Sequence, residues 1–243
     1  MWHPLPSESM HASGVAVTGN VDLRLALQAQ RADALAAQLQ HLLGPLTGKE
    51  RALDSGCGAG ALAFALSPHV RKVIGVDASP ELVEAGSRQS PLNVTLTVGD
   101  ATALPFGYGE FDLAGCLRVL HHVRRPELVI SELARVTVPG GTVLVVDQLG
   151  DVDPLRSIAV DRFERARDPS HTRLLPDGDI RSLLEANDLV VVANEVTHEE
   201  RDLERYLDLA GVPPDARNDV RALAPGATFT VDVGWYVARR PRR

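Results

Sequence analysis

Two short apolar runs in this chain each end in an acid, and a glycine-rich turn lies between them. The run at 51–53 is followed by Asp54, and the run at 73–76 is followed by Asp77. Three alternate glycines come after the first acid: Gly56, Gly58 and Gly60. Glycines let bare backbone approach a ligand, and a carboxylate at the end of a second parallel strand can accept both hydroxyl hydrogens of a ribose. The spacing therefore predicts a site for a ligand that contains a nucleoside.

The charges around the glycine turn narrow the choice of nucleoside. The segment 56–61 also fits the G-x-G-x-x-A pattern of dinucleotide sites. However, Asp54 lies two residues before the first glycine, where it would repel a pyrophosphate but would suit a cationic ammonium or sulfonium. Free amides at the start of the following helix suit a small carboxylate. S-adenosylmethionine carries all three of these charges, and NAD is the alternative ligand.

Further motifs follow in order along the chain. They are Asp54-Ser-Gly56-Cys-Gly58-Ala-Gly60, Asp77, Gly99-Asp100-Ala101, Phe111-Asp112-Leu-Ala and Leu120-His121-His122. With this ordered set, over roughly residues 52–147, the chain resembles the class I S-adenosylmethionine-dependent methyltransferases. The resemblance is to the broad type 11-like group of small-molecule enzymes, which includes quinone and natural-product methyltransferases. A weaker likeness continues into 167–171 and 234–236.

The resemblance also implies which residues hold the cofactor. They are Asp54, Gly56, Gly58, Gly60, Asp77, Ala78, Asp100, Ala101 and Leu117. Asp77 is the leading candidate, as the ribose ligand, and the alternative is that it caps the helix that begins at Pro80. Asp100 either accepts the adenine amine or caps the turn after it. Asp54 either holds the loop by bonding its amides or engages the methionine ammonium.

Three histidines are candidates for a catalytic base or for positioning the acceptor. Methyl transfer from a sulfonium depends mainly on orientation and exclusion of water, so few catalytic side chains are needed. His121 and His122 follow the fourth predicted strand, at the edge where open α/β sheets place their clefts. A histidine there could take a proton from an acceptor hydroxyl or acidic carbon, or could bond a backbone carbonyl. His171 lies in a segment that we expect to cover the site.

Apolar runs alternate with helical patterns along most of the chain. Strands are predicted at 51–55, 72–76, 93–98, 111–116, 142–148, 189–196 and 228–238, and helices near 59–67, 80–89, 126–137 and 177–187. Continuous apolar strands such as 143–146 indicate a parallel sheet that is covered on both faces. We expect an α/β fold with a Rossmann-like, doubly wound sheet of seven strands. The sheet should be mostly parallel, with one antiparallel strand from the C-terminal segment.

Three segments lie outside this alternation. Residues 1–43 combine a flexible arm with a helix that either packs on the sheet or forms a lid over the cofactor. Residues 44–243 are expected to form the methyltransferase domain, in which 148–175 is an inserted cap over the active site. A charged helix is predicted at about 199–210.

Composition excludes several classes of protein. The 243 residues are 44% hydrophobic, which predicts one sizeable core, and the net charge of −7 argues against a nucleic-acid groove. No apolar stretch is long enough for a membrane span, and no signal-peptide pattern opens the chain. Cys57 and Cys116 are too few for a disulfide framework, and no metal-ligand spacing is present. A reducing cytoplasm is therefore the expected location.

The resemblance implies an enzyme that methylates a small organic acceptor, as a monomer or a homodimer. One alternative is an NAD-dependent oxidoreductase built on the same half-sheet. The other is a non-catalytic module in which S-adenosylmethionine only orders the protein. No motif specifies the acceptor, or whether the methyl group goes to oxygen, nitrogen or carbon.

Overall fold

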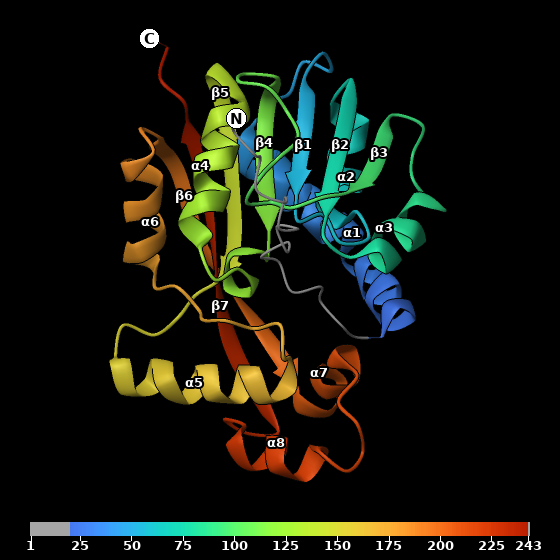
Figure 1. The fold of residues 1–243 in the computed structure, drawn as a ribbon, viewed down its shortest axis with the longest axis vertical. Helices are drawn as coiled ribbons and strands as arrows, with labels where there is room; N and C mark the ends of the chain where they lie inside the picture. Colours follow the sequence, from blue (N-terminus) through green and yellow to red (C-terminus); the bar gives the residue numbers. More distant parts are fainter. Residues whose placement is uncertain (1–19, 243) are drawn as a thin grey trace, which may run out of the picture.

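The computed structural model describes residues 20–242 and shows a twisted sheet with helices on both faces (Figure 1). The strands are β1 (Arg51–Ser55), β2 (Lys72–Asp77), β3 (Val94–Val98), β4 (Phe111–Leu117), β5 (Thr137–Gln148), β6 (Val190–Asp202) and β7 (Thr228–Arg239). Their order in the sheet is β3-β2-β1-β4-β5-β7-β6. Strands β1 to β5 pair in parallel, and β7 is antiparallel to both β5 and β6. The predicted seven-stranded, mostly parallel sheet with one antiparallel strand is therefore confirmed.

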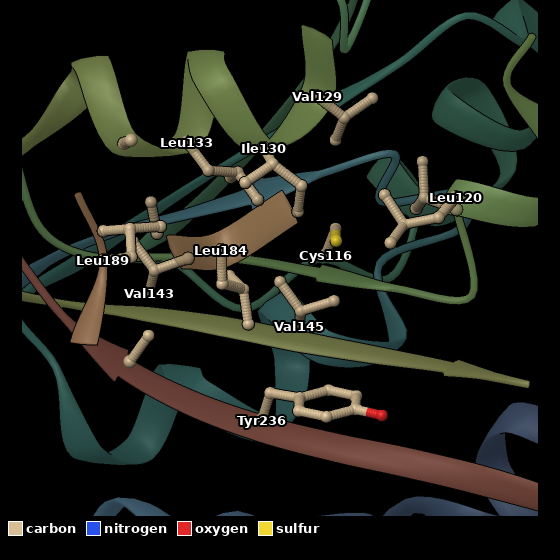
Figure 2. Close-up of a cluster of buried hydrophobic side chains, with 14 of the residues drawn as sticks. Cys116, Leu120, Val129, Ile130, Leu133, Val143, Val145, Leu184, Leu189 and Tyr236 are labelled. Carbon is tan, nitrogen blue, oxygen red and sulfur yellow. The ribbon is translucent and has the colours of Figure 1, made fainter. Parts of the chain in front are cut away.

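The helices divide between the two faces of the sheet. They are α1 (Val21–Leu43), α2 (Ala61–Leu66), α3 (Pro80–Ser87), α4 (Pro126–Val136), α5 (Pro154–Arg167), α6 (Asp177–Ala186), α7 (Leu203–Ala210) and α8 (Arg217–Leu223), with 3-10 turns at η1 (Ser67–His69) and η2 (Leu120–His122). One buried cluster joins α1, α2 and α3 to β1, β2 and β5. The other joins α4 and α6 to the opposite face, where Ile130 and Leu133 of α4 pack over Val143, Val145 and Tyr236 (Figure 2). Burial on both faces explains why residues 143–146 of β5 are continuously apolar.

Three helices pack together beyond the carboxyl ends of the central strands. Helices α5, α7 and α8 lie below the sheet in Figure 1. Phe163 of α5 packs there with Leu207 of α7 and Val220 of α8 in a third apolar cluster. We call these three helices the cap. Helix α5 belongs to the segment 148–175 that was expected to cover the active site, whereas α7 and α8 come from later in the chain.

One helix boundary was predicted wrongly. The charged helix expected from Glu199 begins only at Leu203, because β6 continues to Asp202 and pairs there with Thr228 of β7. Ladder pairing satisfies the backbone of these charged residues, which outweighs their helical propensity. Asp202 then starts α7, and its side chain accepts a hydrogen bond from the Arg205 amide at 2.9 Å.

The first described helix has clear limits at both ends. Asn20 caps α1 by accepting a hydrogen bond from the Leu23 amide at 3.1 Å, and Gly44, at φ 68°, ends the helix. The arm expected at 1–19 lies outside the described residues. Within residues 20–242, no helix combines the length and the apolar character needed to cross a membrane.

We predict that Leu133→Ala lowers the free energy of unfolding by about 2–5 kcal/mol, because the change leaves a cavity between α4 and the sheet. Leu133 has no exposed surface. The matched control is Val152→Ala, since Val152 is 83% exposed, and its effect should stay within about 0.5 kcal/mol. Urea denaturation measures both variants, and equal losses would contradict the packing described for α4.

Candidate active site

A cavity of about 650 Å³ lies at the carboxyl ends of the central strands. Residues at or just beyond four strand ends line it: Asp54 of β1, Asp77 of β2, Leu117 of β4 and Gln148 of β5. One face of α1 forms the opposite wall, through residues at helical spacing: Arg24, Leu27, Gln28, Arg31, Ala34, Leu35 and Gln38. Residues of β6 and of the cap close the remaining side. The cavity is thus where the fold rule for open α/β sheets places a ligand.

The glycine loop lies against Asp77. Oδ2 of Asp77 accepts a hydrogen bond from the Gly58 amide at 2.7 Å, and Oδ1 accepts one from the Ser79 amide at 2.8 Å. The N-terminal residue that caps helix α3 is Ser79 rather than Asp77, since the Ser79 hydroxyl accepts a hydrogen bond from the Leu82 amide. Burial raises the pKa of Asp77, and the two amides and Arg24 oppose that rise. Asp77 therefore fastens the loop to β2 while its side chain lines the cavity.

Gly56 and Gly58 serve the loop in different ways. Gly56 has φ +73°, and a Cβ there would lie 2.4 Å from a methyl group of Val119, so only glycine fits against that side chain. At Gly58, with φ +52°, the nearest atom to a Cβ would be 3.9 Å away. Both residues line the cavity, whereas Gly60 does not.

Asp54 is a buried acid with an unused oxygen. Its exposed fraction is 1%, and Oδ2 accepts a hydrogen bond from the Ala63 amide at 2.9 Å. Oδ1 has no hydrogen-bond partner among the described residues. Burial raises the pKa of Asp54 to about 7, although the Ala63 amide acts in the opposite direction. A buried acceptor without a partner is costly, so a ligand cation at this wall would satisfy it.

The remaining predicted cofactor residues have different positions. Asp100 follows β3, and its Oδ1 accepts hydrogen bonds from the amide and the hydroxyl of Thr102 at 2.8 and 2.7 Å. Asp100, Ala101 and Ala78 do not line the cavity, whereas Leu117 does. Since β3 pairs with β2 in parallel, Asp100 lies at the same edge of the sheet as Asp77.

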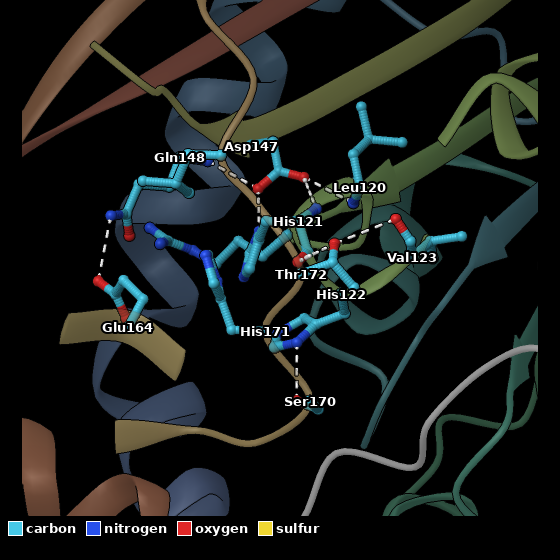
Figure 3. A network of polar contacts seen from close by, with 12 residues as sticks. Leu120, His121, His122, Val123, Asp147, Gln148, Glu164, Ser170, His171 and Thr172 are labelled. Atoms are coloured by element: carbon cyan, nitrogen blue, oxygen red, sulfur yellow. Dashed lines mark hydrogen bonds and ion pairs between the residues drawn. The ribbon is translucent and has the colours of Figure 1, made fainter. Parts of the chain in front are cut away.

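Asp147 holds the two-histidine turn in place. Its carboxylate accepts hydrogen bonds from the amides of Leu120 (2.6 Å), His121 (3.3 Å) and Gln148 (2.7 Å), and it also contacts Nδ1 of His121 (Figure 3). Burial would raise the pKa of Asp147, but attraction to His121 and the hydrogen bonds hold it below its usual value. An ionised carboxylate can only accept hydrogen bonds, so Nδ1 of His121 carries the hydrogen that faces Asp147.

His122 is held by a hydrogen-bonded chain through Ser170 to Asp168. Nδ1 of His122 lies 2.8 Å from the Ser170 hydroxyl, and that hydroxyl donates to Oδ1 of Asp168 at 2.5 Å. The single hydroxyl hydrogen is used on Asp168, so Nδ1 of His122 must donate to Ser170. Burial lowers the pKa of His122 to about 3, with repulsion from His121 adding to the effect. The ring is therefore neutral, and Nε2 carries a free lone pair.

His121 and His122 line the cavity, but His171 does not. The rings of His121 and His122 lie 4.1 Å apart, and that of His171 lies 5.8 Å from His121. Nε2 of His171 contacts Asp161 at 2.8 Å in a buried pair. His171 thus packs behind the histidine pair. Phe163 packs within the cap, and Trp235 lines the cavity.

Several cavity residues were not predicted. They are Arg24, Arg31, Arg118, Gln148, Arg167, Asp168, Glu199, Glu200, Arg201 and Tyr206. Two of them had a usable signal, because Arg118 and Gln148 directly follow or end strands at the ligand-binding edge. Arg118 also has φ 60°, a conformation that non-glycine residues adopt mainly where the surrounding structure imposes it. Arg167 and Asp168 lie in 167–171, where the family likeness gave a weaker signal, and the others come from α1, β6 and α7, whose placement no motif encodes.

Comparison with known proteins agrees with this geometry. A family profile described as a methyltransferase domain matches residues 53–145. The Bacillus subtilis methyltransferase YcgJ is 32% identical over 176 residues, covering 71% of this chain and 70% of that protein. The crystal structure of YcgJ superposes with a TM-score of 0.78 at 26% identity, covering 87% of this chain and 99% of that one. The chain therefore belongs to the class I S-adenosylmethionine-dependent methyltransferases.

Two further proteins illustrate the breadth of the similarity. The ubiquinone biosynthesis O-methyltransferase of Methylococcus capsulatus is 38% identical over 97 residues, which cover 38% of this chain and 41% of that protein. Geranyl diphosphate C-methyltransferase from Streptomyces coelicolor, solved with S-adenosyl-L-homocysteine and geranyl diphosphate, has a TM-score of 0.63 at 17% identity, covering 96% of this chain and 92% of that one. The second likeness concerns the fold alone.

We predict that Asp54 makes stability depend on pH. Its pKa is about 7 in the folded protein and 3.8 in the unfolded chain, so folding favours the protonated acid. This contribution is complete below the unfolded pKa and is lost as the pH rises through about 7. Relative to Asp54→Asn, the wild type should therefore lose stability between pH 5 and pH 8 in urea denaturation. The control is Asp22→Asn in the first turn of α1, and parallel curves for wild type and Asp54→Asn would show that Asp54 is ionised throughout.

We also predict that His122 is a neutral Nδ1–H tautomer from about pH 5 to pH 8, because its pKa is near 3 and Ser170 fixes the hydrogen. Nitrogen-15 spectra of labelled histidines measure the tautomer directly. Ser170→Ala should give a mixture of the two tautomers. Thr172→Val removes a neighbouring hydroxyl that bonds the His121 and Val123 carbonyls instead, so it should leave His122 unchanged. A charged His122 at neutral pH would refute the assignment.

Proposed function

We propose that this protein transfers a methyl group from S-adenosylmethionine to a small organic acceptor bound in the cavity beneath α1. One observation carries the proposal: the glycine loop with its two acids and the oriented histidine pair line the same volume. Membership of the methyltransferase family disfavours the dehydrogenase alternative. The cytoplasmic location and the monomeric or homodimeric state stay predictions from the sequence.

The residues at the β1 and β2 ends fit this cofactor. Each carboxylate oxygen of Asp77 can accept more than the one amide hydrogen it receives, so Asp77 can also accept the ribose hydroxyls. The unused Oδ1 of Asp54 suits the methionine ammonium, and a cation there would favour the ionised acid. We assign Asp100 and Ala101 as contacts of the cofactor's adenine. Ala78 and Leu117 are assigned to the surface around its ribose.

The histidine pair supplies the chemistry that the chain itself must provide. S-adenosylmethionine, when bound, contributes an electrophilic methyl group on its sulfonium. Nε2 of His122, held as a lone-pair acceptor by the chain through Ser170 to Asp168, accepts a hydrogen bond from the methyl acceptor and so positions it. His121, fixed by Asp147, orients the acceptor beside it. The wall formed by α1 excludes water, as transfer to an organic acceptor requires.

We predict that Asp77→Ala weakens binding of S-adenosyl-L-homocysteine at least tenfold, about 1.4 kcal/mol, because one charged hydrogen-bond acceptor for the ribose is lost. Isothermal titration measures the affinity. Asp112→Ala is the matched control, since Asp112 accepts the Arg51 amide away from the cavity. Binding of NAD in place of S-adenosyl-L-homocysteine would overturn the proposal. Tight cofactor binding with no methylated product, by mass spectrometry across a broad acceptor panel, would favour the non-catalytic alternative.

A further inference from the structure

One carboxylate in the cavity wall is shared by three arginines. Glu199 of β6 lies 3.3 Å from Arg31 of α1 and 2.7 Å from Arg201, and it also forms an ion pair with Arg118 at the end of β4. All four residues line the cavity. One negative charge therefore faces three positive charges at this wall, which we call the arginine wall (Arg31, Arg118 and Arg201).

The other charges on the cap side of the cavity are already matched. Arg167 pairs with Glu164 at 2.8 Å, and Arg24 pairs with Asp168 at 3.9 Å. Glu200 also lines the cavity but is exposed to solvent. Counting Glu200 against the arginine wall still leaves an excess of positive charge there. Asp54 and Asp77 also line the cavity, but at its cofactor side, so the positive excess is confined to the arginine wall and a negative ligand is favoured there.

Arg201 has binding capacity to spare. Its exposed fraction is 7%, it lines the cavity, and its Nε–H has no hydrogen-bond partner among the described residues. A guanidinium has five donors arranged for a planar oxyanion, and Glu199 takes only part of this capacity. Burial lowers the pKa of Arg201, and repulsion from Arg118 acts in the same direction. An additional anion would relieve that repulsion.

The aromatic side chains near the arginine wall are unsuited to an ammonium group. Recognition of a substituted ammonium needs an open aromatic face. The Tyr206 ring already has the guanidinium of Arg167 at 3.9 Å and that of Arg201 at 5.3 Å. Trp235 is 7% exposed, and its Nε1–H donates to Thr197 at 3.0 Å. A cationic acceptor would thus face arginine side chains and find no open aromatic face to bind it at this wall.

We propose that the arginine wall binds an oxyanion of the methyl acceptor, so that the acceptor is an acid bearing a carboxylate or a phosphate rather than an amine. The inference rests on the proposed function, since the wall lies in the same cavity as the histidine pair. The acid group on the arginine wall would leave another part of the acceptor facing Nε2 of His122.

Titration calorimetry of the full chain in dilute buffer tests the wall with simple probes: acetate, inorganic phosphate and methylammonium. Wild type should bind at least one of the two anions and not methylammonium. Arg118→Gln and Arg201→Gln should each weaken anion binding about tenfold, as expected for losing one charged contact. Arg88→Gln, which removes an exposed pair with Glu84, should change it less than twofold. Preference for phosphate or for acetate identifies which acid the acceptor carries.

A gain-of-binding variant guards against misfolding as an explanation. Glu199→Gln removes the carboxylate that competes for the three arginines, so anion binding should tighten at least threefold. Failure of both anions to bind, preference for methylammonium, or unchanged affinity in both arginine variants would overturn the inference. Titration with S-adenosyl-L-homocysteine runs in parallel on every variant. Loss of its binding in wild type refutes the proposed function, whereas its binding without any anion binding refutes only the acidic acceptor.

Discussion

The buried carboxylate of Asp147 joins the parts of this molecule on which the site depends. It lies one residue before the end of β5, accepts the amides of the turn that follows β4, and fixes the ring of His121. Two neighbouring parallel strands are thereby locked at the edge where the cavity opens. Asp77 plays the corresponding role between β2 and the glycine loop. In both halves of the site, a buried carboxylate accepts hydrogen bonds from backbone amides. Neither carboxylate can move without leaving those amides unpaired, so both are fixed in place.

The cofactor half of the site was largely predictable, because its residues are close in sequence and each follows a strand. Asp54, Asp77 and Leu117 line the cavity as a consequence of parallel strands ending at one edge. The seven-stranded, mostly parallel sheet was predicted from apolar runs separated by helical patterns. The boundary at Glu199 was missed because the charged, alternating sequence of β6 fits a helix locally, and only pairing with β7 decides in favour of a strand.

Apart from the histidine pair, the side of the cavity assigned to the methyl acceptor could not be predicted, because it is assembled from segments far apart in the chain. Arg31 of α1 meets Glu199 of β6 across 168 positions, and Arg118 meets the same carboxylate across 81. The partners of His122 and His171 also depend on where α5 folds back, which no periodicity encodes. A short charged segment has the same sequence character whether it faces solvent or a binding site. Only the tertiary arrangement therefore distinguishes a binding wall from a solvated surface.

Helix α1 packs on α2 and α3 through apolar side chains, but it contacts β6 and the cap side of the cavity through polar side chains, which has a kinetic consequence. Arg24 reaches Asp168, Arg31 reaches Glu199 and Gln38 reaches Glu195. Such contacts are individually weak and screened by salt. Opening of the cavity on this side would break these contacts together, so release of spent cofactor and product from the proposed enzyme would quicken as ionic strength increases.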